Sequence, residues 1–121
     1  MSVKILIVDD ETEVLEAVDT LLSTRGFEIL TAQGGHEAIA LLKNCQPELV
    51  ILDIRMKGMD GMEILKKAKE LNPSVQVAMI TGLNDEGIEE KCRGLGAAHF
   101  LRKPLGVEEL EKVVAEFNDR K

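Results

Sequence analysis

Apolar residues in this chain gather in short, nearly unbroken runs. Four such runs lie at Val3–Val8, Leu49–Leu52, Val75–Ile80 and Ala97–Leu101. Strands of a parallel sheet are covered on both faces and are therefore apolar at consecutive positions, so these runs predict buried parallel strands. A fifth run, Phe27–Thr31, has Glu28 among its apolar residues, which is typical of an edge strand.

The segments between the runs have apolar residues three or four positions apart, as the buried face of an amphipathic helix does. Gly26 and Asn72-Pro73 are expected to end the first and third helices. Alternating strands and helices predict a doubly wound α/β domain with right-handed connections, and 121 residues fit one domain, 1–121. The five predicted helix faces are Val14, Val18, Leu21 and Leu22; Ala38, Ile39 and Leu42; Met62, Leu65, Ala68 and Leu71; Ile88, Cys92 and Leu95; and Val107, Leu110, Val114 and Phe117.

Composition narrows the functions open to this domain. The net charge is −7 and aromatic residues make up 2% of the chain, which argues against direct binding of nucleic acid. No apolar run approaches the roughly 20 residues of a membrane span, and no signal peptide is visible. Cys45 and Cys92 have no second cysteine or histidine at metal-ligand spacing, so we expect reduced thiols in a cytoplasmic protein.

Polar residues follow the buried runs where each predicted strand ends. Asp9 and Asp10 follow the first run, Asp53 follows the next inner run, and Thr81 and Lys103 follow the last two. Because the carboxyl ends of parallel strands share one edge of the sheet, we expect these side chains to converge in one crevice.

Three carboxylates at one edge repel each other, so either their pKa values rise or a cation binds. An all-oxygen cluster with few protein ligands favours Mg²⁺, which usually accompanies a phosphate. Lys103 could pair with that phosphate and Thr81 could donate a hydrogen bond to it. One carboxylate could be the nucleophile of an aspartyl phosphate, but the pattern does not say which.

Four motifs, "VDDE", "LDIRMKGMDG", "ITG" and "LRKP", together resemble the receiver domain of two-component response regulators, from about Val3 to Phe117. The resemblance implies a five-stranded parallel sheet in the order 2-1-3-4-5. It also implies a phosphorylation-activated signalling switch that turns over no separate metabolite.

The resemblance implies a role for each acidic position. Asp53 would accept a phosphoryl group from the phosphohistidine of a histidine kinase. Asp9, Asp10 and Asp53 would hold Mg²⁺ together with the backbone carbonyl of Arg55.

The resemblance also implies a set of switch residues. Thr81 would move to hydrogen-bond the phosphoryl oxygen, Lys103 would contact the phosphate, and the Lys103–Pro104 peptide would be cis. Phe100 stands at the aromatic switch position, where the frequent tyrosine hydroxyl is missing, so any switch there would work by packing alone.

Three positions near the site bear on how this chain compares with the family: one departs from the family pattern, and two lie where the family tunes the lifetime of the phosphate. Lys57 stands where many members have proline, which removes a rigid residue and adds a cation. Arg55 and Leu83 occupy positions that tune the phosphate lifetime in the family.

Other interpretations stay open at this stage. Asp9 and Asp10 could merely cap the helix that follows them. The domain could be a phosphate-independent interaction module, or a small enzyme or flavin carrier of the same shape. The expected partners are a histidine kinase or a histidine phosphotransfer protein and a downstream protein or an attached output domain, with no membrane and no direct nucleic-acid contact.

Overall fold

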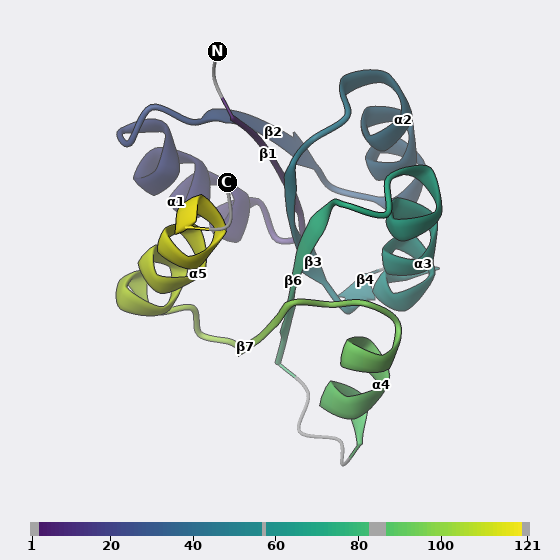
Figure 1. Ribbon diagram of the computed structural model, residues 1–121. Helices are drawn as coiled ribbons and strands as arrows, with labels where there is room; N and C mark the ends of the chain where they lie inside the picture. The colour runs from purple at the N-terminus through teal and green to yellow at the C-terminus, as the bar shows by residue number, and fades with distance from the viewer. Residues whose placement is uncertain (1–2, 57, 83–86, 120–121) are drawn as a thin grey trace.

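The protein is described by a computed structural model in which residues 3–56, 58–82 and 87–119 are placed (Figure 1). A five-stranded parallel sheet runs through its centre in the order β2-β1-β3-β6-β7, which confirms the predicted doubly wound α/β fold and the order 2-1-3-4-5. The sheet strands are β1 (Lys4–Val8), β2 (Glu28–Ala32), β3 (Leu49–Asp53), β6 (Gln76–Thr81) and β7 (His99–Arg102).

Helices cover both faces of the sheet (Figure 1). One face carries α1 (Thr12–Ser23) and α5 (Val107–Asp119). The opposite face carries α2 (Gly35–Cys45), α3 (Gly61–Leu71) and α4 (Ile88–Gly94).

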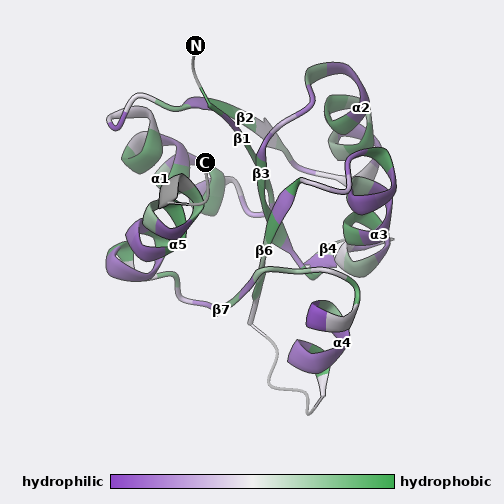
Figure 2. Ribbon diagram, viewed as in Figure 1, coloured by the Kyte–Doolittle hydropathy of each residue, from purple (hydrophilic) through white to green (hydrophobic). Residues whose placement is uncertain are grey.

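The core consists of two largely aliphatic layers separated by the sheet. Successive residues of β1 alternate between them, because Ile5 and Ile7 pack with α1 and α5 whereas Leu6 and Val8 pack with the helices of the other face. The middle parts of the inner strands are accordingly hydrophobic in Figure 2. This double burial explains the nearly unbroken apolar runs of the sequence.

The register of the sheet aligns the ends of its strands. Val8 pairs with Leu52 between β1 and β3, so Asp9 and Asp53 leave the sheet side by side. Thr81 pairs with Arg102 between β6 and β7, which places Lys103 just beyond Thr81.

Several boundaries follow the predicted signals. Helix α1 ends before Gly26, whose φ is +86°, and α3 ends at Leu71, directly before Asn72-Pro73. Strand β2 lies at the edge of the sheet, as Glu28 indicated.

Other features differ from the prediction. A short antiparallel ribbon, β4 (Arg55–Met56) and β5 (Met59–Asp60), was not predicted, because two residues per strand are too few for an alternating pattern. Leu71 and Val107 were predicted on buried faces but are 43% and 55% exposed. Both stand at a helix end, where the periodicity continues although the covering sheet does not.

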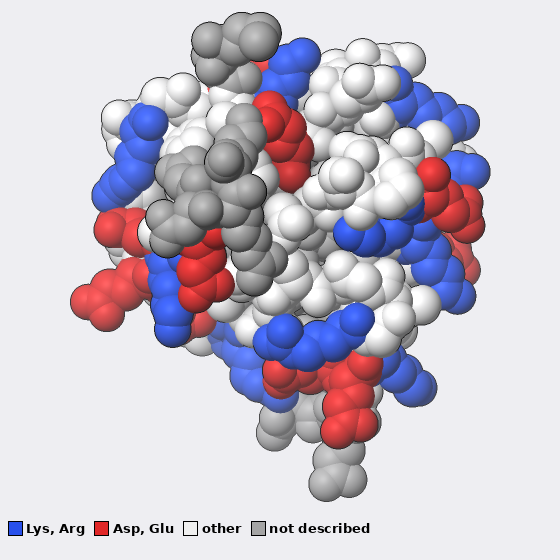
Figure 3. All heavy atoms as spheres, in the orientation of Figure 1, with Lys and Arg blue, Asp and Glu red and all other residues white. Residues whose placement is uncertain are grey.

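Charged side chains of both signs are interspersed on the face drawn in Figure 3. Among the described residues, no helix has the length and hydropathy that a membrane crossing requires.

Candidate functional site

The carboxylates predicted at the strand ends lie together. One oxygen from each of Asp9, Asp10 and Asp53 lies within 4.8 Å of the others, an arrangement that could hold a metal ion. Asp9 and Asp53 are buried, whereas Asp10 is exposed at the mouth of the cluster. Two of the three carboxylates therefore lie inside the protein, and one is open to solvent.

Asp9 is fixed by the backbone around it. Its amide donates to the carbonyl of Ala32 at 3.1 Å, and its Oδ1 accepts from the amide of Glu11 at 2.8 Å. Its Oδ2 is buried and accepts no hydrogen bond from the described residues, although the ammonium of Lys103 lies 3.1 Å away. A buried carboxylate oxygen in this state suits coordination of a hard cation.

Asp53 stands at the end of β3 with a perturbed acidity. Burial, followed by the charge of Asp9, raises the pKa of Asp53 to about 6, against the opposing effects of Lys103 and of a hydrogen bond from the Arg55 backbone amide. A pKa near 6 means that the charged carboxylate is disfavoured at this position, and a cation bound beside Asp53 would stabilise the charged form.

Lys103 reaches the cluster from the loop after β7. Its Nζ lies 2.8 Å from Glu11 Oε1, 3.1 Å from Asp9 Oδ2 and 3.2 Å from Asp53 Oδ2. Burial alone would lower the pKa of Lys103, but the hydrogen bond to Glu11, the close contact with Asp9 and the charges of the two aspartates outweigh it, so the pKa lies above its usual value. The ammonium therefore stays charged. The Lys103–Pro104 peptide is cis, as the resemblance implied.

Thr81 borders this group from the end of β6. It is buried, and its backbone carbonyl accepts a hydrogen bond from the Lys103 amide at 2.8 Å. The strand end of Thr81 and the loop that carries Lys103 are therefore joined directly.

Phe100 lies outside the carboxylate cluster. It is half-buried on β7, pairs with Met79 in the sheet register, and packs against the core of the α2, α3 and α4 face. The guanidinium carbon of Arg102 lies 5.5 Å from the centre of its ring. Lys57 and Leu83 lie outside the described residues.

Glu11 is the site residue that the sequence analysis missed. It appeared only as the third acid of "VDDE", yet it makes the shortest of the contacts to Lys103. Its partner is 92 residues away in the chain, so no local pattern could have found the pair.

Known proteins resemble this chain over most of its length. The family model of the response regulator receiver domain matches residues 5–115. Two relatives come from Bacillus subtilis (strain 168). The uncharacterized transcriptional regulatory protein YesN is 34% identical over 120 residues, and sporulation initiation phosphotransferase F is 30% identical over 117 residues. These matches cover 93% and 97% of this chain; the chain spans only 33% of the length of YesN but 94% of phosphotransferase F.

A solved structure supports the same relationship. The crystal structure of the CheX-CheY-BeF3-Mg²⁺ complex from Borrelia burgdorferi contains a chain that is 34% identical and superimposes with a TM-score of 0.87. The alignment covers 95% of this chain and 89% of that chain. Because the family match spans nearly all of the described fold, the chain belongs to the response regulator receiver domains, the signalling domains of two-component systems.

Proposed function

We propose that the chain is a phosphorylation-controlled binding switch, in which Asp53 accepts a phosphoryl group from a phosphohistidine. The donor would be a sensor histidine kinase or a histidine phosphotransfer protein. The observation that carries this proposal is the surroundings of Asp53, with two further aspartates within 4.8 Å and an ammonium 3.2 Å from its Oδ2. The family membership of the chain supports the same assignment.

We assign Mg²⁺ to the carboxylate cluster, held by Asp9, Asp10, Asp53 and the backbone carbonyl of Arg55. The fit rests on the all-oxygen donor set and on the buried Oδ2 of Asp9, which accepts no hydrogen bond from the described residues. When bound, the ion supplies positive charge that stabilises the anionic oxygens of a transferring phosphoryl group.

The transfer itself requires little from the protein beyond position and charge. A carboxylate oxygen of Asp53 attacks the phosphorus, the new P–O bond forms as the P–N bond of the phosphohistidine breaks, and the histidine nitrogen keeps the electron pair. Lys103, already beside Asp53, offsets the negative charge of the phosphoryl oxygens. The chain would catalyse only its own phosphorylation and dephosphorylation.

The proposed switch runs from Thr81 to Phe100. Thr81 would turn to donate a hydrogen bond to the phosphoryl group, and the joined loop of Lys103 would respond with it. Phe100 would repack without a hydroxyl to direct it, and the surface of α4, β7 and α5 would change its affinity for a partner.

The comparisons suggest two forms of output. The chain spans nearly all of phosphotransferase F, which favours a separate downstream partner, but only a third of YesN, which favours an output segment on the same polypeptide. In either form the proposal includes a cytoplasmic location, in keeping with the free thiols of Cys45 and Cys92.

The test is the intact mass of the protein after incubation with Mg²⁺ and acetyl phosphate. We expect the gain of one phosphoryl group, which should be absent without Mg²⁺ and absent in Asp53→Asn. A folded wild-type chain that gains no mass and binds no beryllofluoride, a mimic of the phosphoryl group, would instead favour the phosphate-independent interaction module.

A further inference from the structure

Lys103 has one carboxylate partner more than the proposed chemistry requires. Its ammonium has three N–H donors and lies within 3.2 Å of carboxylate oxygens from Glu11, Asp9 and Asp53. Asp9 and Asp53 belong to the buried cluster. The side chain of Glu11 is instead 58% exposed, yet it makes the shortest contact, at 2.8 Å.

The carboxylate of Glu11 is not used to cap the helix that it precedes. Glu11 is the N-cap residue of α1, with φ −92° and ψ 111°, but its side chain accepts no capping hydrogen bond. Its backbone amide donates to Asp9 Oδ1, which holds the residue in place and leaves the side chain to reach Lys103.

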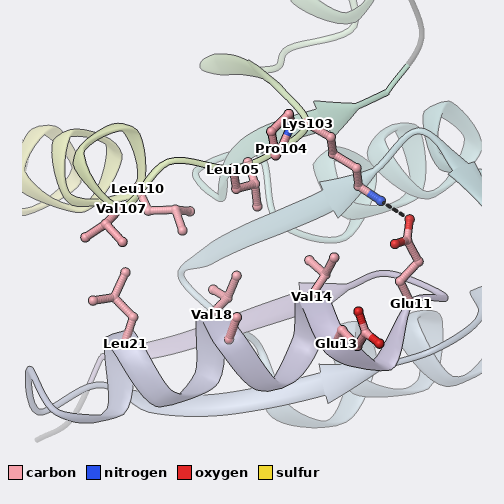
Figure 4. A pocket seen from close by; sticks show the side chains of 11 residues that line it. Glu11, Glu13, Val14, Val18, Leu21, Lys103, Pro104, Leu105, Val107 and Leu110 are labelled. Atoms are coloured by element: carbon pink, nitrogen blue, oxygen red, sulfur yellow. Dashed lines mark hydrogen bonds and ion pairs between the residues drawn. The ribbon is translucent and has the colours of Figure 1, made fainter.

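The Glu11–Lys103 pair connects the start of α1 with the loop before α5 (Figure 4). It lies at one end of a cavity of about 500 Å³ between the two helices. In Figure 4, Val14 and Val18 of α1 face Leu105 and Leu110 across this cavity. The pair thus sits on an open apolar cleft, where its geometry is not locked by dense packing.

We propose that Glu11 is a positioning residue that holds Lys103 over the cluster and competes with the phosphoryl group for its ammonium. The inference rests on the proposed function. Asp9 is assigned to the metal and Asp53 is the nucleophile that accepts the phosphoryl group, so Glu11 is the partner that Lys103 can exchange for a phosphoryl oxygen. Glu11 would therefore limit how tightly the phosphorylated site is held together.

The direction of the effect follows from charge. Removing the Glu11 carboxylate frees one donor of Lys103 and takes a negative charge away from an anionic ligand, and both changes favour that ligand. Without Glu11 the Lys103 side chain would be less well ordered, which opposes this gain. The effect is limited, because Lys103 is only 17% exposed and keeps its contacts with Asp9 and Asp53. The gain is expected to be small, because partly exposed ion pairs are screened by water.

The first experiment tests the contact in the metal-free protein. A double-mutant cycle combines Glu11→Gln with Lys103→Met and compares their folding equilibrium constants from urea unfolding. We expect Glu11→Gln to lower this constant about 2- to 5-fold more in the wild-type background than in Lys103→Met. An equal effect in both backgrounds would show that Glu11 does not hold Lys103 and would overturn the inference.

The second experiment measures the affinity for beryllofluoride in the presence of Mg²⁺, followed by ¹⁹F NMR. We expect Glu11→Gln to bind about 2- to 5-fold more tightly than the wild type. Glu11→Asp, which keeps the charge but is one methylene too short to hold Lys103, should show part of this gain and bind more tightly than the wild type. Glu13→Gln removes an exposed carboxylate that lines the same cavity and should bind like the wild type.

Each other outcome overturns the inference in a distinct way. Unchanged or weaker binding by Glu11→Gln would exclude competition, and Glu11→Asp behaving like the wild type would show that only the field of the charge matters. A matching gain in Glu13→Gln would show a diffuse charge effect. A wild type that binds no beryllofluoride would overturn the proposed function and the competition together, whereas coupling in the metal-free cycle would still show that Glu11 holds Lys103.

Discussion

In the absence of a bound metal ion, the surroundings of Asp53 disfavour the negatively charged form of its side chain. Burial and the charge of Asp9 raise its pKa from 3.8 to about 6. The folded protein therefore holds this proton more tightly than the unfolded chain does. The contribution of Asp53 to stability is thus fully present below pH 3.8 and is lost as the pH rises through about 6.

We predict that Asp53→Asn stabilises the metal-free protein by about 1 to 3 kcal/mol at about pH 7.5. The amide keeps the shape of the carboxyl group without the buried charge, so the gain should shrink as the pH falls towards about 4. Urea unfolding across this pH range, with a metal chelator present, measures it. Glu16→Gln, which removes an exposed charge from α1, controls for net charge. A variant no more stable than wild type near neutral pH would contradict the prediction.

At the scale of residues, the sequence predicts the site members that directly follow a strand better than it predicts Glu11. Asp9, Asp53 and Thr81 each follow an apolar run, so the strand pattern alone places them at one edge. Glu11 stands beside them but owes its contact to Lys103, which folding brings from 92 residues away. An exposed carboxylate carries no pattern that reveals such a partner.

At the scale of elements, the start of α3 packs against the end of β3, the strand end that carries Asp53. The amide of Gly61 donates to the carbonyl of Ile54 at 2.7 Å, which brings the first residue of α3 against the end of β3. A Cβ on Gly61 would collide with the backbone oxygen of Asp53 and lie 2.8 Å from the Cα of Ile54. Only glycine fits here without a shift of the strand end.

We predict that Gly61→Ala destabilises the protein by about 1 to 3 kcal/mol, because backbone atoms cannot yield as a side chain can. The displaced Asp53 should also weaken Mg²⁺ binding. Gly94→Ala is the matched control: it lies in α4 with nothing within 4 Å of the added Cβ, and its stability should change by less than about 1 kcal/mol. Unfolding curves and Mg²⁺ titrations of the two variants decide the matter, and equal behaviour would rule out a supporting role for Gly61.

The elements themselves were predictable where their burial is uniform. Strand β3 is buried at every residue, and β1 and β6 at every residue but the first, so the apolar runs mark these strands. The ribbon β4–β5 has two residues per strand, too few to show a strand pattern in the sequence. Periodicity also could not show that Leu71 and Val107, at helix ends, are exposed. Both differences have one cause: a local sequence pattern does not show which residues other parts of the fold will pair with or bury.

At the scale of the whole molecule, folding brings together three carboxylates that could hold a cation and that come from two separate parts of the chain. Asp9 and Asp10 follow β1 and Asp53 ends β3, so only the folded sheet brings their oxygens within 4.8 Å. A ligand that binds only the folded state stabilises it by mass action. We predict that Mg²⁺ at ten times its dissociation constant stabilises the wild type by about 1.4 kcal/mol, measured by thermal or urea unfolding.

The control for this prediction has to separate a built site from a diffuse attraction, because a chain with a net charge of −7 draws divalent cations to its whole surface. Asp10→Asn changes the exposed member of the cluster and leaves the buried contacts of Asp9 and Asp53 with Lys103 in place. Its unfolding should respond to Mg²⁺ no more than to potassium chloride of equal ionic strength. If Asp10→Asn kept the full response, the stabilisation would come from the acidic surface, and the assignment of the ion to this cluster would fail.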